Sequence, residues 1–404
     1  LYMHHLLYSF LFVCLAYLDL QAQTTNIPDS IFEQKLITLG IDSDGQVNGQ
    51  ILNSDAASIT KLDVGGANIS DLTGIAAFTA LDSLLCYGNN LTNLNLTANG
   101  NLRHLNCASN NLNSINIHGL NQLEDLYCHN NYLSALDISS NAALKKINCN
   151  SNSLTALNVS SNVQLEELSC SWNQIGGLNL STHVFLKTLY CKENGLSGLD
   201  VSVCAALELL QCDKNDLTTL NLINNTNLVT LSCHENQLTS LDLSNHPNLI
   251  FLYANSNQLT SLNIQGAGEL TNLQCVANQL TTLDLSTNTK LEHLSCGSNQ
   301  LTNLDLELDT ALFYVSCSYN PSLTGVNIQN GHNTKFFNQG FIMSKWFSAT
   351  NNPALQHVCV DDVNYCLSQN NWDIPSTASF TTDCSLIPIQ KVVPISYENY
   401  IYPN

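Results

Sequence analysis

Apolar and polar positions follow a strict period of 21 residues along most of this chain. Leucine opens twelve consecutive repeats, at Leu81, Leu102, Leu123, Leu144, Leu165, Leu186, Leu207, Leu228, Leu249, Leu270, Leu291 and Leu312. Asparagine follows eight residues after each of these leucines, from Asn89 to Asn320, and the repeat reads LxxLxCxxNxLTxLxLxxNxx. Such self-similarity predicts a solenoid, because each repeat can bury its apolar residues only against its neighbours.

The first half of the repeat predicts a short β-strand. Alternate residues of LxxLxC would turn inward, and stacked repeats would pair these strands into one parallel sheet. The asparagine stands where the chain turns, and its amide can satisfy backbone groups that the buried turn would leave unpaired. The second half, such as Leu238 to Ser244, is rich in Thr, Ser and Asn, which predicts an extended or irregular outer side rather than a helix.

Cysteine occupies one position of the repeat eleven times, at Cys86, Cys107, Cys128, Cys149, Cys170, Cys191, Cys212, Cys233, Cys275, Cys296 and Cys317. Neighbouring thiols in such a stack would lie about 4.8 Å apart with parallel Cβ vectors. A disulfide needs converging Cβ atoms about 3.8 Å apart. Ala254 fills the same position once, so the pattern predicts buried thiols that act as small hydrophobic side chains. A metal–thiolate ladder is disfavoured, and no metal site is expected.

The first residues predict an export signal. Met3 is a plausible start, an apolar run extends from Leu6 to about Leu18, and Gln21 to Gln23 offers a cleavage region. The run is short for a membrane span. A retained segment and a lipoprotein signal using Cys14 are the alternatives, and no span is expected in the mature chain.

The chain is strongly acidic, with 32 acidic and 12 basic residues and a formal net charge of −20. Nucleic-acid binding requires clustered Lys and Arg, so this balance argues against it. It equally disfavours an anionic membrane surface. A cationic or neutral partner, such as a glycan, a peptide or a protein, fits better.

The motif LxxLxCxxNxL resembles the leucine-rich-repeat consensus, with Cys in place of one Leu. From about Ile27 onward the chain is similar to secreted leucine-rich-repeat proteins of Bacteroidota. This resemblance implies a leucine-rich-repeat solenoid with one parallel β-sheet on the concave face. The convex side would be mostly extended or irregular, with little α-helix outside the N-terminal cap.

Two C-terminal segments extend the resemblance. Residues 352–384 resemble the C-terminal cap of such arrays, within which we expect a Cys359–Cys384 disulfide that leaves Cys366 over. The final SYENYIYPN resembles the first strand of the type A sorting domain of the type IX secretion system. That similarity implies the type IX secretion machinery as a partner, a secreted or cell-surface location, and a sorting domain cut short at residue 404.

These features predict five parts. They are a signal peptide at 3–23, an N-terminal cap at 24–58, the repeat array at 59–332, a C-terminal cap at 333–386, and a linker with the start of a sorting domain at 387–404. The array comprises a lead-in repeat and the twelve 21-residue repeats, and we expect a monomer. The N-terminal cap includes a predicted amphipathic helix within 27–40, with Phe32, Leu36 and Ile37 on one side.

One exposed column alternates in charge, reading Asp82, Arg103, Glu124, Lys145, Glu166, Lys187 and Glu208. Like charges in adjacent rungs of a parallel stack would repel, and alternation turns that repulsion into weak attraction. We therefore assign this column to stacking and register rather than to a ligand.

Two other columns predict a recognition patch on the sheet. Lys192, Asp213 and His234 follow the cysteines of adjacent repeats, and Lys214 and Glu235 stand beside them. Exposed aromatic side chains suit protein and glycan contacts, and the patch would also include Tyr127, His129, Trp172, Tyr190 and Tyr253. The alternative, a solvated charged ladder with incidental aromatics, remains open.

Catalysis is not expected. The patch offers no obvious nucleophile and no enclosed pocket, and the sequence lacks HExxH, P-loop and GxSxG motifs. His129 and His234 are five repeats apart, roughly 24 Å, so they cannot share a metal ion. The sequence therefore predicts a non-enzymatic, cofactor-free protein that binds a protein or polysaccharide on its sheet, or alternatively an adhesin or cell-surface spacer without a single ligand.

Overall fold

The computed structural model describes residues 23–335 and 346–387 of this chain. The chain divides into two compact units, Leu1–Ile175 and Gly176–Asn404, called the N-terminal and C-terminal units below. The predicted signal peptide, apart from Gln23, and residues 388–404 of the predicted sorting segment lie outside the described residues.

The N-terminal unit begins with a small cap. Strands β1 (Thr24–Asn26) and β2 (Gln50–Leu52) pair antiparallel, and helices α2 (Ser30–Thr38) and α3 (Asn53–Ala57) complete it. Asp29 caps α2, since its Oδ1 accepts the backbone N–H groups of Ile31 and Phe32 at 2.9 and 3.0 Å. The predicted helix is confirmed, with Phe32 and Leu36 buried and Ile37 only half-buried.

The main sheet of the N-terminal unit is parallel and in register with the 21-residue period. Its strands are β3 (Lys61–Asp63), β4 (Ser83–Leu85), β6 (His104–Asn106), β8 (Asp125–Tyr127), β9 (Lys146–Asn148) and β10 (Glu167–Ser169). A 3₁₀ turn, η1 (Ile75–Ala77), lies between β3 and β4. On the outer side β5 (Asn93–Asn95) pairs with β7 (Ser114–Asn116).

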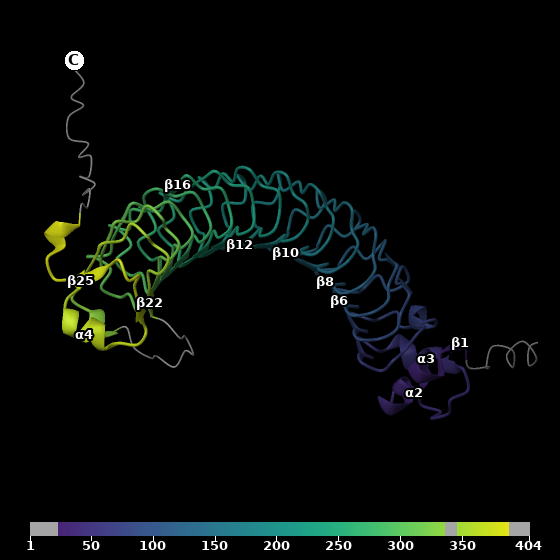
Figure 1. Cartoon of the computed structure of the whole chain (residues 1–404). Coiled ribbons are helices and arrows are strands. Elements are labelled where there is room, and N and C mark those ends of the chain that lie inside the picture. The colour runs from purple at the N-terminus through teal and green to yellow at the C-terminus, as the bar shows by residue number, and fades with distance from the viewer. Residues whose placement is uncertain (1–22, 336–345, 388–404) are drawn as a thin grey trace, which may run out of the picture. The chain divides into compact units, whose positions relative to one another are not determined.

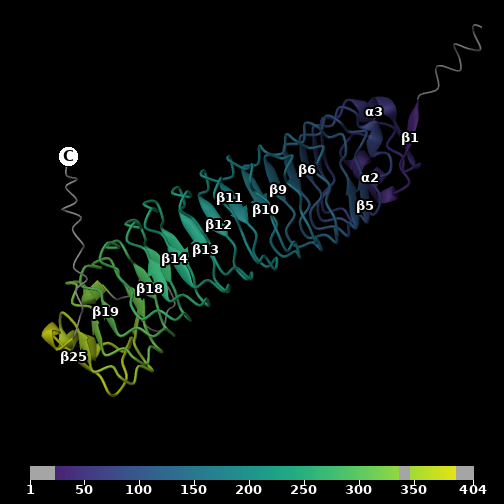
Figure 2. The same ribbon diagram turned by 90° about the horizontal axis from the view of Figure 1, so that it is seen from above.

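The C-terminal unit repeats this plan (Figure 1). Its main sheet contains β11 (Thr188–Tyr190), β12 (Leu209–Gln211), β13 (Thr230–Ser232), β15 (Phe251–Tyr253), β17 (Asn272–Gln274), β18 (His293–Ser295), β20 (Tyr314–Ser316), β22 (Phe347–Ser348) and β24 (Trp372–Asp373). Consecutive strands such as β11, β12 and β13 lie side by side (Figure 2). The predicted parallel sheet is confirmed.

The outer side of the C-terminal unit is more regular than the sequence suggests. Strands β14 (Ser240–Asp242) and β16 (Ser261–Asn263) pair, as do β19 (Asn303–Asp305), β21 (Gly325–Asn327), β23 (His357–Cys359) and β25 (Ser379–Thr381) in that order. Figure 1 shows β16 on the opposite side of the coil from β12. Short parallel ladders therefore interrupt an otherwise irregular outer side.

Both ladders of the C-terminal unit continue past residue 332. Phe347 pairs with Val315 and Trp372 pairs with Phe347, which adds two rungs to the main sheet. The turn η2 (Asn333–Lys335) precedes β22, helix α4 (Val363–Ser368) precedes β24, and η3 (Cys384–Leu386) follows β25. The described part of the predicted C-terminal cap thus extends the coil as well as ending it.

An asparagine ladder joins consecutive rungs. The Nδ2 of Asn236 donates to the carbonyls of Cys212 and Cys233 at 3.0 and 3.1 Å, and its Oδ1 accepts the N–H of Leu217 at 3.1 Å. The same pattern recurs along both units, for instance at Asn110 and Asn278. The predicted role of this asparagine, satisfying backbone groups at the turn, is confirmed.

The cysteine column is buried and reduced. All of its thiols have side chains closed off from solvent, and Ala254 is equally buried. Burial raises the pKa of the Cys275 thiol to about 12, so the reactive thiolate is absent at neutral pH. The thiols act as small hydrophobic side chains, as predicted.

A second polar column lies inside the outer half of the coil, at the last asparagine of the repeat. The amide of Asn225 donates to the carbonyls of Val201 and Cys204 at 3.0 and 2.9 Å, and Asn288 repeats this geometry. Asp309 occupies the same position in a later rung, and burial raises its pKa to about 7. The sequence pattern showed this column without indicating its function.

Candidate recognition site on the sheet face

A hollow opens on the sheet face of the C-terminal unit. Its volume is about 520 Å³, and it lies over β12, β13, β15 and β17 and the turns that follow them. It is lined by Lys192, Gln211, Asp213, Ser232, His234, Glu235, Tyr253, Asn255, Ser256 and Gln274. We call it the His234 hollow. Five of the residues predicted for a recognition patch line it.

Asp213 forms the floor of the His234 hollow. Its side chain is 3% exposed, and its Oδ1 accepts hydrogen bonds from the Ser232 hydroxyl and from the backbone N–H of His234. The sequence predicts an exposed patch without an enclosed pocket, and for Asp213 this is wrong, because its side chain is buried. Ser232 and His234 of the following rung contact this carboxylate and cover it.

His234 stands between two carboxylates. Its Nε2 is 3.5 Å from Oδ1 of Asp213, and its Nδ1 is 3.3 Å from Oε1 of Glu235. The imidazole is 27% exposed and the Glu235 side chain is 50% exposed. The two carboxylates hold the His234 imidazole in one orientation, and the ring remains exposed enough for a partner to contact it.

The residue before each ladder asparagine has a left-handed backbone. Glu193, Lys214 and Glu235 have φ of 53°, 52° and 52°. Side chains other than Gly, Asn and Asp are uncommon in this conformation. Lys214 Nζ is 3.4 Å from Oε1 of Glu193 on the preceding rung, so predicted charged neighbours do meet at the rim of the hollow.

The remaining predicted residues lie elsewhere. Tyr190 ends β11 and is half-buried, but it does not line the hollow. Tyr127, His129 and Trp172 belong to the N-terminal unit. Burial lowers the pKa of His129, and Trp172 is 45% exposed with a left-handed φ of 57°.

Sequence reasoning missed the amides and hydroxyls of the His234 hollow. Gln211, Ser232 and Gln274 end the three strands β12, β13 and β17, in the same column as Tyr253. Asn255 follows the cysteine position, in the same column as Asp213 and His234. These residues could have been predicted from their positions in the repeat, which are the positions of Tyr253, Asp213 and His234. They are neither charged nor aromatic, so the prediction did not include them.

The charge-alternating column stabilises stacking in the N-terminal unit. Glu124 forms an ion pair with Arg103 on the preceding rung, and its Oε2 lies 2.7 Å from Lys145 Nζ on the following rung. Hydrogen bonds from Lys145 and Arg103 lower the pKa of Glu124 to about 2. These contacts match the predicted role in register, and each exposed pair contributes little by itself.

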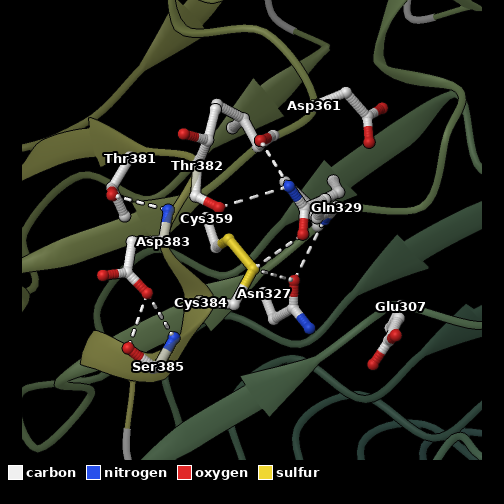
Figure 3. The surroundings of a disulfide bond; sticks show 12 residues. Glu307, Asn327, Gln329, Cys359, Asp361, Thr381, Thr382, Asp383, Cys384 and Ser385 are labelled. Atoms are coloured by element: carbon white, nitrogen blue, oxygen red, sulfur yellow. Dashed lines mark hydrogen bonds between the residues drawn. A yellow bond between two sulfur atoms is a disulfide. The ribbon is translucent and has the colours of Figure 1, made fainter.

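A disulfide closes the far end of the described chain. Cys359 at the end of β23 is bonded to Cys384 at the start of η3, 25 residues later (Figure 3). Gln329 bridges the same region, since its Nε2 donates to the carbonyls of Val360 and Thr382 at 3.3 and 3.4 Å. This is the pairing that the cap resemblance led us to expect, and Cys366 is buried and reduced.

The requirements of a metal site and of a membrane-spanning helix can be compared with residues 23–335 and 346–387. No group of three or more His, Cys, Asp or Glu side chains there is arranged to hold a metal ion. Within the same ranges, no helix has the length and apolarity needed to cross a membrane.

Comparison with known proteins supports the fold. No protein-family model matches the sequence, and no curated protein matches it either. Among solved structures, the chain is similar to the functional domain of InlJ from Listeria monocytogenes, which is described as including a cysteine ladder. The identity is 28%, the TM-score is 0.66, and the match covers 90% of this chain and 73% of that one.

Two further structures show the same fold at lower identity. An internalin, inlF, from Listeria monocytogenes is 20% identical with a TM-score of 0.64, covering 88% of this chain and 98% of that one. A leucine-rich-repeat protein from Leptospira interrogans is 20% identical with a TM-score of 0.59, covering 83% and 96%. The fold is therefore a leucine-rich-repeat solenoid, as predicted.

Proposed function

We propose that this chain is an exported, monomeric, non-enzymatic recognition protein that binds a protein or polysaccharide on its sheet face. The observation that carries the proposal is the His234 hollow, where a buried carboxylate, an oriented imidazole and a half-buried tyrosine meet. Polar groups that converge in a concave site can fix the orientation of a ligand and give specificity. The leucine-rich-repeat fold, typical of protein-interaction modules, favours a protein partner.

The rim of the hollow supports this role. Glu193, Lys214 and Glu235 occupy left-handed positions, where Gly88 and Asn130 stand in earlier rungs. Residues in such conformations cost on the order of 1–3 kcal/mol unless the surroundings favour them. The same column also holds Ser, Trp, Ala and Tyr, so the backbone does not select the residue, and long charged side chains at three successive rungs offer contacts to a partner.

The hydrogen bonds in the hollow favour binding over catalysis. Ser232 donates its hydroxyl proton to Asp213. In the Ser-His-Asp arrangement a serine nucleophile donates instead to an imidazole, which is the general base. The Asp213 carboxylate thus fixes neighbouring groups in place, and the proposal includes no cofactor, no metal and no nucleic acid.

Location and route belong to the same proposal. The apolar run after Met3 and the final SYENYIYPN support export through type IX secretion to the cell surface or the medium, in a protein of Bacteroidota origin. The acidic net charge of −20 supports a cationic or neutral ligand.

Affinity capture with the full chain tests the proposal. We expect one saturable partner whose binding falls at least tenfold in His234→Ala and Tyr253→Ala. The matched controls His118→Ala and Tyr132→Ala change exposed residues of the N-terminal unit and should bind like wild type. Equal binding by all four variants contradicts the proposal. Loss of cell cohesion on deletion, without a saturable partner, supports the spacer alternative instead.

A further inference from the structure

A second hollow lies at the opposite ends of the same strands. It is about 500 Å³ in volume and is lined by Glu208, Asn227, Val229, Asn248, Ile250 and Glu269. Glu208, Val229 and Ile250 directly precede β12, β13 and β15. We call it the Glu208 hollow; it lies within the C-terminal unit, beside the sheet that carries the His234 hollow.

The Glu208 hollow forms where the charge alternation stops. Up to Glu208 the column alternates in sign, so a basic residue would stand next, but Val229 and Ile250 occupy the next two rungs. Both side chains are half-buried, while Glu208 is exposed. Glu208 therefore lacks the cation on its following rung that Lys145 provides for Glu124.

The other carboxylate of this hollow already has a cation. Both oxygens of Glu269 lie 2.6 Å from Lys290 Nζ on the following rung. Glu208, whose column neighbour on the preceding rung is Lys187, is therefore the carboxylate of the hollow that has no cation on its following rung. It lies at the edge of an apolar floor made by Val229 and Ile250.

These surfaces fit the side chain of a lysine or arginine. Such a side chain lays its methylene stem on apolar atoms and keeps its charged end near a carboxylate. An acidic group would be repelled by Glu208, and a purely apolar group would remove water from that carboxylate without replacing its hydrogen bonds. The side-chain amides of Asn227 and Asn248 donate to the carbonyls of Ala205 and Thr226, and their oxygens add hydrogen-bond acceptors at the rim.

The surface between the two hollows is aromatic. Phe251 is 37% exposed and Tyr253 is half-buried, and both lie on β15. Ile250 and Asn255 flank this strand and are five residues apart in the chain, at most about 17 Å at the rise of an extended chain. An extended peptide of five or six residues is long enough to reach from one hollow to the other.

We propose that the Glu208 hollow receives a lysine or arginine side chain from an extended segment of a partner protein, which crosses β15 toward the His234 hollow. This inference rests on the proposed function and narrows its ligand to a basic peptide segment. The far end of this path also carries a net negative charge. The His234 hollow and its rim contain three carboxylates and two lysines, namely Glu193, Asp213, Glu235, Lys192 and Lys214.

Selection of peptides on the full chain tests this inference. A random dodecapeptide library is panned on the immobilised protein, and the tightest peptide is labelled with fluorescein and measured by fluorescence anisotropy. We expect selected peptides to be enriched in Lys and Arg. Glu208→Gln should weaken binding at least fivefold, and Val229→Lys, which restores the alternation and fills the hollow, should abolish it.

Matched variants separate this site from general charge attraction. Glu307→Gln removes one exposed carboxylate elsewhere in the C-terminal unit and should leave the affinity unchanged. The Glu208→Lys variant should bind a version of the selected peptide in which the key basic residue of the peptide is replaced by Glu. Circular dichroism checks whether the Val229→Lys variant is folded. If that variant is unfolded, the affinity of the Glu208→Gln variant decides the test.

Several outcomes overturn the inference. They are an absence of selected peptides, selection without basic enrichment, equal weakening by Glu208→Gln and Glu307→Gln, or binding of a glycan in place of any peptide. A peptide that is lost with His234→Ala but unaffected by Glu208→Gln overturns this inference alone and leaves the proposed function standing.

Discussion

Asp213 holds His234 in place from below. One carboxylate oxygen accepts the backbone N–H of His234 at 3.1 Å and lies 3.5 Å from Nε2 of the same residue. The carboxylate thus fixes both the main chain and the ring of a residue on the next rung. The candidate recognition site and the stacking of rungs β12 and β13 therefore depend on the same buried group.

Asp213→Ala should lower the free energy of unfolding by about 1–3 kcal/mol, because the Ser232 hydroxyl and the His234 N–H lose their acceptor. Asp213→Asn keeps an acceptor oxygen and should lose less. Urea unfolding followed by circular dichroism measures both. Asp216→Ala, at an exposed position on the same rung, is the control, and an equal loss there would refute the role assigned to Asp213.

The asparagine ladder predicts a larger effect inside the coil. Asn236→Ala leaves the carbonyls of Cys212 and Cys233 and the N–H of Leu217 without this partner. We expect a loss of at least about 2 kcal/mol in unfolding free energy. Asn248→Ala changes an exposed asparagine and should stay within about 0.5 kcal/mol of wild type. Comparable losses in the two variants would count against the ladder.

Asp309 predicts an unusual dependence of stability on pH. Its folded pKa of about 7 exceeds its ordinary value of 3.8, so the folded chain holds a proton that the unfolded chain has released. This residue's contribution to stability is fully present below about pH 4 and is lost as pH rises toward 7. Asp309→Asn should therefore raise the unfolding free energy at pH 8 by about 1–3 kcal/mol.

That gain should shrink as pH falls and approach zero below about pH 4, where Asp309 becomes protonated in the unfolded chain as well. Urea titrations of wild type and variant at pH 4, 6 and 8 measure the trend. The exposed Asp216→Asn serves as the matched control. A gain that is the same at all three pH values would mean that the buried carboxyl does not titrate as described.

The Cys359–Cys384 disulfide predicts a redox dependence confined to the end of the C-terminal unit. A crosslink closing 25 residues contributes about 3 kcal/mol by restricting the unfolded chain. Cys384→Ser should therefore speed hydrogen exchange in β23 and β25 while leaving β11 to β13 unchanged. Dithiothreitol should speed the same exchange in wild type and have no further effect in the variant. A uniform increase of hydrogen exchange along the unit would contradict a local stabilising role for the disulfide.

The 21-residue period made most of the fold predictable. Leu, Cys and Asn stand at positions where only one packing environment exists, so strands, register and the ladder followed from spacing. Burial of Asp213 did not follow, because its column contains both covered and open residues. Ser171 and Asp213 are 2% exposed there, whereas Lys192 and His234 are half-buried.

The outer ladders were unpredictable for a related reason. Whether β14 and β16 pair depends on how closely two rungs approach. A Cβ at Gly266 would lie 1.8 Å from the carbonyl oxygen of Ser244, so this glycine permits an approach that other residues would block. In the sequence, the Glu208 hollow corresponds only to a break in the charge alternation. Its shape depends on how the neighbouring rungs pack, which the sequence does not show.

The reach of each ladder asparagine into the preceding rung also restricts how such a chain can change in length. Loss or duplication of 21 residues anywhere between two ladder asparagines recreates every bond, because each new junction presents the same carbonyls and N–H group to the next amide. A change of any other length between a strand and the ladder asparagine that follows it displaces that amide from its partners and leaves buried groups without hydrogen bonds. Genes for this array should therefore vary by whole steps of 63 nucleotides, and insertions of intermediate size should be confined to the turns outside the ladder.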